Sequence, residues 1–147
     1  MSQTTSTAKV QTWLKNLKNG NLTSKTVRVL KYIQDHPNTN LHTMRNFFDT
    51  ADKAKITHPT LTSAISNLMD EGIVKLVGNV EVAGNSYSSY HFVENEIDRY
   101  WLKKQRRAEG FIRWAKQGLN DFPLLTDDNL QVALYNAIHK TQKQMKD

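Results

Sequence analysis

The pattern of apolar and polar residues along the chain predicts helices over most of its length and one pair of strands in its middle. Apolar residues recur at steps of three and four, the spacing of one helix face, in early segments at residues 10–17, 24–35 and 41–48. Between residues 73 and 93 the pattern changes toward alternation, which is typical of strands. Helical spacing returns after Glu94. The sequence therefore predicts a mainly α-helical chain with a small β-hairpin.

The most informative segment is a short helix predicted between Thr57 and Asp70. Thr57 or His58 can cap its start, Pro59 suits its first turn, and Gly72 can adopt the left-handed conformation that ends many helices. One face is apolar and carries Leu61, Ala64, Ile65, Leu68 and Met69. The other face carries small hydroxyls and one amide, on Thr60, Thr62, Ser63, Ser66 and Asn67. A helix with these two faces is suited to entering a groove.

The segment that follows reads as a β-wing. Two strands, Ile73–Val82 and Tyr87–Val93, flank the turn sequence Ala83-Gly84-Asn85-Ser86. Gly78 interrupts the alternation of the first strand, which indicates a bulge or a bend.

At 147 residues, the chain has room for one domain with a helical extension. We expect four parts: a disordered tail at 1–8, an N-terminal helix at 9–22, a central domain at 23–94 and a C-terminal helical extension at 95–147. In the extension, residues recur at steps of four and three along a seam of Ile97, Trp101, Lys104, Ala108, Phe111 and Ala115. Asn120–Pro123 forms a break, and Thr126 can cap a last helix.

Residues 24–93 resemble a winged helix-turn-helix domain of the MarR-like or small bacteriophage type. The resemblance rests on Val27-x-x-Leu30-x-x-Ile33, on Leu41-x-x-Met44-x-x-Phe47, and on the run from Pro59 to Val74. It implies a winged-helix core with added terminal helices, and double-stranded DNA as the partner of a regulator of transcription. The sequence departs from the pattern in three places: the stretch 49–56 is long for the turn, the helix 58–70 lacks Arg and Lys, and Glu81 lies near the wing tip.

The resemblance assigns roles to three groups of residues. Thr60, Thr62, Ser63, Ser66 and Asn67 would contact bases, since Asn pairs with adenine through two hydrogen bonds. Phosphates would be held by Lys25, Arg28, Lys31, Lys53, Lys55 and His58. The wing would follow the groove or backbone through Asn79, Asn85, Ser86 and Tyr87.

The terminal helices have two interpretations. In MarR-like proteins such helices form a dimer interface, which here would use Trp13, Leu17, Trp101, Phe111 and Trp114. Alternatively, the basic helix would bind a nucleic-acid backbone or an acidic protein through Arg99, Lys103, Lys104, Arg106 and Arg107. The spacing of Trp101 and Trp114 fits the apolar seam, which favours a core position over base stacking.

Charge and composition add to this picture. Residues 99–116 contain seven Lys or Arg and one Glu, an excess of six that equals the net charge of the whole chain. Such a concentration favours an anionic partner, or alternatively a solvated helix face. The chain has no cysteine and no long apolar run, so we expect a protein of the cytosol, or of the host cytosol if it is viral, with no membrane contact.

The sequence offers little for catalysis. The histidines, at positions 36, 42, 58, 91 and 139, show no metal-ligand spacing, and the glycines form no phosphate-binding loop. No cysteine nucleophile and no Gly-x-Ser-x-Gly turn is present. We therefore expect a protein that is not an enzyme and needs no cofactor.

The main alternative to DNA binding is a winged-helix module that binds another protein, such as a phage-encoded inhibitor of a host protein. The uncharged front of the helix 58–70 and the acidic wing favour this alternative, whereas the net charge of +6 opposes it. A smaller alternative is binding of single-stranded nucleic acid or RNA through the basic helix.

Overall fold

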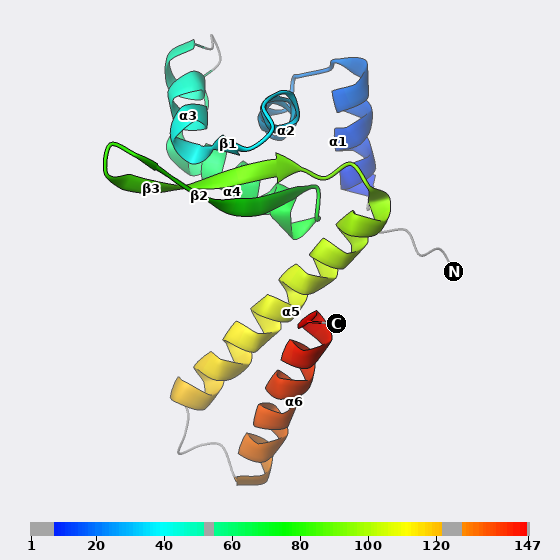
Figure 1. Cartoon of the computed structure of the whole chain (residues 1–147). Coiled ribbons are helices and arrows are strands. Elements are labelled where there is room, and N and C mark those ends of the chain that lie inside the picture. Colours follow the sequence, from blue (N-terminus) through cyan, green and yellow to red (C-terminus); the bar gives the residue numbers. More distant parts are fainter. Residues whose placement is uncertain (1–7, 52–54, 122–127, 147) are drawn as a thin grey trace. The chain divides into compact units, whose positions relative to one another are not determined.

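A computed structural model describes residues 8–51, 55–121 and 128–146 of the chain (Figure 1). Over these residues the chain is mainly helical, with six α-helices, a short π-helix and a three-stranded antiparallel sheet. It divides into two compact units, residues 1–103 and 104–147. Residues 1–7 of the expected tail at 1–8, the loop residue Lys53 and the proposed cap Thr126 lie outside the described residues, while Ala8 is the first residue of a helix.

The first two helices have the bounds that their capping residues suggest. Helix α1 covers Ala8–Asn19 and is followed by Gly20, whose φ of +74° is the left-handed conformation that glycine tolerates. Helix α2 covers Lys25–Asp35, and the Ser24 hydroxyl accepts a hydrogen bond from the Val27 backbone N–H. These two helices pack against each other, and α2 also packs against α4 and β3.

The region between α2 and α4 contains two elements that periodicity did not predict. Strand β1, Thr39–Asn40, precedes helix α3, Leu41–Asn46, whose first turn is capped by the Asn40 side chain. A π-helix, η1, continues from Phe47 to Ala51. The spacing Leu41-x-x-Met44-x-x-Phe47 predicted an inward Phe47, which was wrong: Phe47 is 39% exposed, while Phe48 is buried. Adjacent helical residues point in different directions, so only one of the two can reach the core.

Helix α4 covers His58–Asp70 and has Pro59 in its first turn. Thr57 occupies the N-cap position, but its side chain makes no capping hydrogen bond there. Gly72 has a φ of +73°, as expected for a residue that ends a helix in the left-handed conformation. The chain then enters the sheet directly, because Val74 is the first residue of β2.

The sheet has the strand order β1-β3-β2, with β2 covering Val74–Val82 and β3 covering Asn85–Phe92. The hairpin turn is tighter than predicted, since Val82 pairs with Asn85 and only Ala83 and Gly84 lie between the strands. The register shifts between Leu76 and Gly78, which confirms the predicted irregularity at Gly78. The β2–β3 hairpin extends to the left of the helices in Figure 1.

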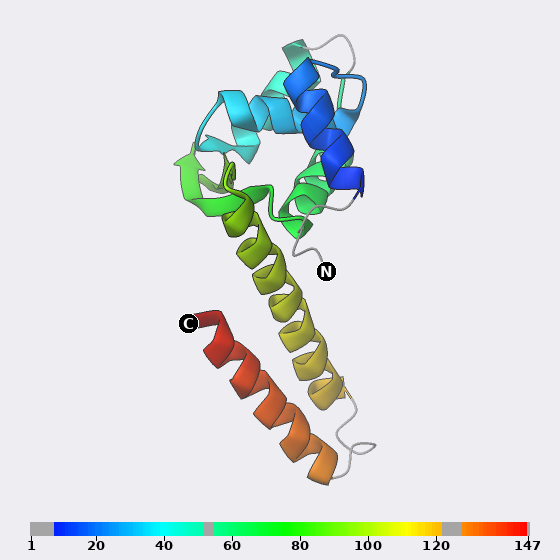
Figure 2. The same ribbon diagram turned by 90° about the vertical axis from the view of Figure 1, so that its right-hand side faces the viewer.

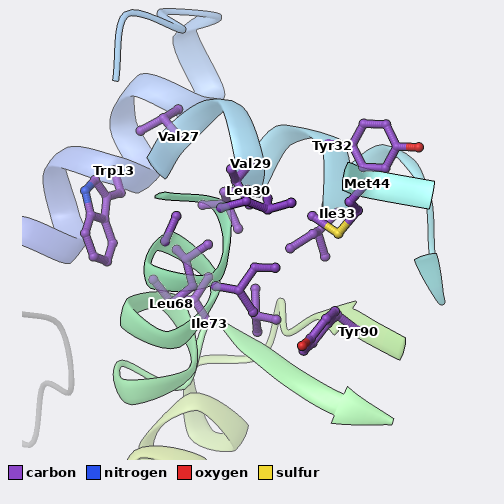
Figure 3. Close-up of a cluster of buried hydrophobic side chains, with 14 of the residues drawn as sticks. Trp13, Val27, Val29, Leu30, Tyr32, Ile33, Met44, Leu68, Ile73 and Tyr90 are labelled. Atoms are coloured by element: carbon purple, nitrogen blue, oxygen red, sulfur yellow. The ribbon is translucent and has the colours of Figure 1, made fainter. Parts of the chain in front are cut away.

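The core of the first unit lies between α1, α2, α4 and the sheet (Figure 3). Trp13 from α1, Leu30 and Ile33 from α2, Leu68 from α4 and Ile73 point into it. Helix α2 is the central element, because Val27, Val29, Leu30 and Ile33 are all fully buried. Each such apolar side chain contributes about 1.5–3 kcal/mol through burial.

Helix α5 covers Glu96–Asp121, and the Asn95 side chain caps its start by accepting hydrogen bonds from the Ile97 and Asp98 backbone N–H groups. Its first turns, within the first unit, are packed against the end of α4. The Arg99 carbonyl oxygen lies where a side chain on Gly72 would be, and Lys103 Nζ contacts Glu71 Oε2 at 3.0 Å. Both side chains of this ion pair are largely buried.

The second unit is a pair of helices, the later turns of α5 and helix α6, Asp128–Lys146, which lie side by side (Figure 2). Their contact is formed by Ile112, Ala115 and Ile138, with Leu119, Leu134 and Met145 packed around them. Of the predicted seam in α5, Ala115 is buried, whereas Ile97, Trp101 and Phe111 are exposed. Gly110 lies within α5 and does not interrupt it.

Candidate nucleic-acid interface

The two faces of α4 are separated as the sequence predicts. Leu61, Ala64, Ile65 and Leu68 are buried in the core of the first unit. On the opposite face Ser63 and Asn67 are exposed, and Thr60, Thr62 and Ser66 are half-buried. The side chains most accessible to a ligand on this face are therefore those of Ser63 and Asn67.

Two of the threonines on α4 have local hydrogen bonds that limit what else they can do. The Thr62 hydroxyl donates to the backbone carbonyls of His58 at 3.2 Å and Pro59 at 3.0 Å, which leaves mainly its acceptor capacity for a base or phosphate. The Thr57 hydroxyl donates to the Thr60 hydroxyl at 3.0 Å, so Thr60 uses acceptor capacity and keeps its own proton. Thr62 is thus less suited to donating a hydrogen bond than the sequence pattern suggests, whereas Thr60 can still donate.

The residues predicted to hold phosphates have different surroundings. Lys25, Lys55 and His58 are exposed. Lys31 pairs with Asp35 at 3.1 Å, and the Arg28 guanidinium lies 5.9 Å from the centre of the Phe48 ring. Lys25 and Lys55 therefore offer the most accessible positive charge of the described candidates.

The wing residues occupy both strands of the hairpin. Asn79 on β2 pairs with Ser88, while Asn85 and Ser86 lie next to the turn, opposite Val82 and Glu81. The Tyr87 ring lies 4.8 Å from the His42 ring of α3, so it is held against a helix and does not extend from the tip. Asn79, Asn85 and Ser86 are exposed and remain available for contacts.

Two residues of the predicted basic helix have structural roles in place of the expected ligand contact. Lys103 is buried and bound to Glu71, so its charge is neutralised inside the first unit. The Arg99 Nε–H donates to the Val93 carbonyl at 2.7 Å, and its guanidinium lies over the Phe92 ring. Burial lowers the pKa of Arg99, while Glu96 and Glu94 oppose the shift. Of the remaining three, Lys104 and Arg107 are exposed and Arg106 is half-buried.

The residues predicted to form a dimer interface fall into two groups. Trp13 and Leu17 belong to the core of the first unit, so they cannot provide surface for a partner as the sequence suggested. Trp101, Phe111 and Trp114 are 62%, 38% and 70% exposed, which corrects the expectation that both C-terminal tryptophans are core residues. The predicted seam was therefore largely wrong: of its positions only Ala115 is buried, and the side of α5 that contacts α6 is formed by Ile112, Ala115 and Leu119.

Glu71 is the residue that sequence reasoning missed. Its carboxylate accepts a hydrogen bond from Lys103, which is 32 positions away in the sequence. No periodic pattern links two such positions, because only the return of α5 to the end of α4 brings them together.

Within the described ranges, no three His, Cys, Asp or Glu side chains are grouped so that they could hold a metal ion. Among the described helices we find no apolar run of the length that a bilayer crossing requires. Comparison with protein-family models and with curated proteins finds no match for this chain.

Proposed function

We propose that the first unit is a winged helix-turn-helix domain that binds double-stranded DNA and regulates transcription or a related DNA transaction. Helix α4 would enter the major groove, and the β2–β3 hairpin would follow the neighbouring backbone or minor groove. The observation that carries the proposal is the division of α4 into a buried apolar side and a side where Ser63 and Asn67 are exposed, directly followed by the hairpin.

The order of elements supports the same function. Helix α2, strand β1, helices α3 and α4, and strands β2 and β3 follow one another, with β3 between the other two strands. The side chains would then divide by role: Asn67 and Ser63 would read bases, and Lys25 and Lys55 would neutralise phosphates. The proposed base and phosphate contacts all lie within one copy of the first unit, so DNA binding does not depend on the homodimer that the sequence predicts.

The proposal is tested by selecting bound fragments from random double-stranded DNA and measuring their affinities by fluorescence anisotropy. Asn67→Ala should reduce discrimination at one base pair by about 1–3 kcal/mol. Lys55→Ala should weaken binding to all sequences alike and lower the salt slope by about one. Lys18→Ala is the matched control, because it removes an equal charge from an exposed position on α1.

Two results would contradict DNA binding. One is an affinity for mixed DNA that does not change with salt below about 200 mM, because phosphate contacts release counterions. The other is an equal effect of Lys55→Ala and Lys18→Ala.

Binding of another protein by the first unit is a second candidate function, and one observation favours it. Two of the basic side chains near α4, Arg99 and Lys103, are bound internally, which leaves less positive charge for DNA than the sequence suggests. If this candidate is right, the protein passes through heparin at low salt, and Asn67→Ala reduces binding to one protein partner.

A further inference from the structure

The described residues of the second unit form only a small core. Among its described residues only Ile112, Ala115 and Ile138 are buried, and the unit consists of two helices. Two helices have only one contact face each, and a single core in fewer than about 70–80 residues rarely supplies more than about 3–5 kcal/mol.

Large apolar side chains of the same unit are exposed on both helices. Phe111 and Trp114 on α5 are neighbours, with ring centres 6.4 Å apart, and they are 38% and 70% exposed. On α6 the exposed residues are Leu130, Val132 and Tyr135, at 49%, 58% and 55%. Neighbouring exposed aromatic residues such as Phe111 and Trp114 are typical of interaction sites, and Trp is among the side chains that most often dominate binding energy.

The charge of this unit identifies the kind of partner. Residues 104–120 and 129–145 contain seven Lys or Arg and a single acidic residue, Glu109. Over the whole of 104–147 the excess is three, because Lys146 adds one positive charge and four further Asp residues, at positions 121, 127, 128 and 147, add four negative charges. Arg107, Arg113 and Lys116 are exposed on the same helix as the two aromatic residues.

Three kinds of partner can be compared on these two properties. A nucleic acid would neutralise the charge and its bases could stack on Phe111 and Trp114, but it would leave the exposed aliphatic residues Leu130 and Val132 uncovered. A second copy of the chain would supply apolar side chains, but it would place one basic surface against another. An acidic protein segment with apolar residues at helical spacing satisfies both requirements.

We infer that the second unit binds an acidic amphipathic helix of another protein, whose apolar face packs on the exposed Phe111 and Trp114 and whose carboxylates pair with Arg107 and nearby cations. The added helix would complete a three-helix bundle around the existing contact. This inference is independent of DNA binding, since the proposed DNA contacts lie in the first unit.

The test uses the full chain and a library of random peptides of about 20 residues, long enough for a helix of about 30 Å. Selected peptides should be rich in Asp and Glu and should carry Leu, Ile or Phe at steps of three and four. Their affinities are then measured by fluorescence anisotropy. Trp114→Ala and Arg107→Glu should each weaken binding by about tenfold or more.

Matched controls separate this site from the rest of the chain. Trp101→Ala removes an equally exposed tryptophan from the first unit, and Lys55→Ala removes a proposed DNA contact; neither should change peptide affinity by more than about twofold. Circular dichroism of each variant shows whether the helices are retained, which is expected because Trp114 is largely exposed.

Several results would overturn the inference. The selection could yield no peptides, or peptides without an excess of acidic residues. Trp114→Ala could leave peptide affinity unchanged. Single-stranded oligothymidine could bind with a Trp114-dependent affinity equal to that of the peptides, which would identify nucleic acid as the partner. Light scattering could reveal a dimer that Trp114→Ala dissociates, which would identify a second copy.

Discussion

Substituting Gly72 with Ala tests the contact between the end of α4 and the start of α5. A Cβ atom on Gly72 would overlap the Arg99 carbonyl oxygen and lie 3.0 Å from its carbonyl carbon. Both atoms belong to the backbone of the first turn of α5, so neither can move away by a change of rotamer. The substitution would therefore have to displace part of a helix.

Two effects determine the expected loss of stability. Gly72 has a φ of +73°, and a residue with a side chain in this region costs about 1–2 kcal/mol. Forcing an extra methyl group into a packed site costs about 1–3 kcal/mol more. Gly72→Ala should therefore lower the free energy of unfolding by about 2–5 kcal/mol, a large part of the 5–15 kcal/mol typical of a domain.

Gly20 provides a matched control. Its φ is +74°, nearly the same as that of Gly72, but a Cβ atom there would have no neighbour within 4 Å. Gly20→Ala should therefore show the conformational cost alone. Urea unfolding can be followed by circular dichroism and by the fluorescence of Trp13, the only one of the three tryptophans that is buried.

The difference between the two variants measures the contact itself. If Gly72→Ala loses no more stability than Gly20→Ala, the end of α4 and the start of α5 are not packed as described. An intermediate result, near 1 kcal/mol of difference, would mean that the first turn of α5 shifts easily.

The remaining predictions concern the hairpin turn and the buried ion pair. Ala83 and Gly84 form the two-residue turn of the hairpin, and Ala83 has a φ of +52°, a conformation in which Asn is preferred before Gly. Ala83→Asn should therefore raise the free energy of unfolding by about 0.5–1 kcal/mol. A decrease would exclude this type of turn. Glu71→Gln leaves the charge of Lys103 buried without its counter-ion and should lower the free energy of unfolding by about 3 kcal/mol. Asp35→Asn removes a charge from an exposed ion pair and should lower it by about 0.5 kcal/mol or less in the same urea assay. Equal losses for the two variants would contradict the burial of the Glu71 pair.

Local patterns predicted the elements whose signals lie within a few residues. Ser24 and Asn40 cap the helices that their positions suggested, and Gly72 has the predicted left-handed conformation. The buried face of α4 also agrees with its periodicity. Strand β1 was not predicted, because two residues are too few to show alternation and pair only with a distant strand.

The candidate site was predictable only in part. The sequence placed Ser63 and Asn67 on the outer face of α4, and both are exposed there. It could not separate cations that face solvent from those that are used internally. Lys103 and Lys104 are adjacent in the sequence, yet one is buried against Glu71 and the other is exposed.

The sequence by itself determined where the helices and the hairpin form, because capping, turn chemistry and hydrophobic periodicity act over a few residues. Tertiary structure decided which apolar faces are covered. Trp13 and Trp114 both follow helical spacing, yet α1 packs into a core and buries the first, while α6 leaves the second exposed. Burial depends on which elements meet in space, and periodicity along a single helix carries no information about its neighbours.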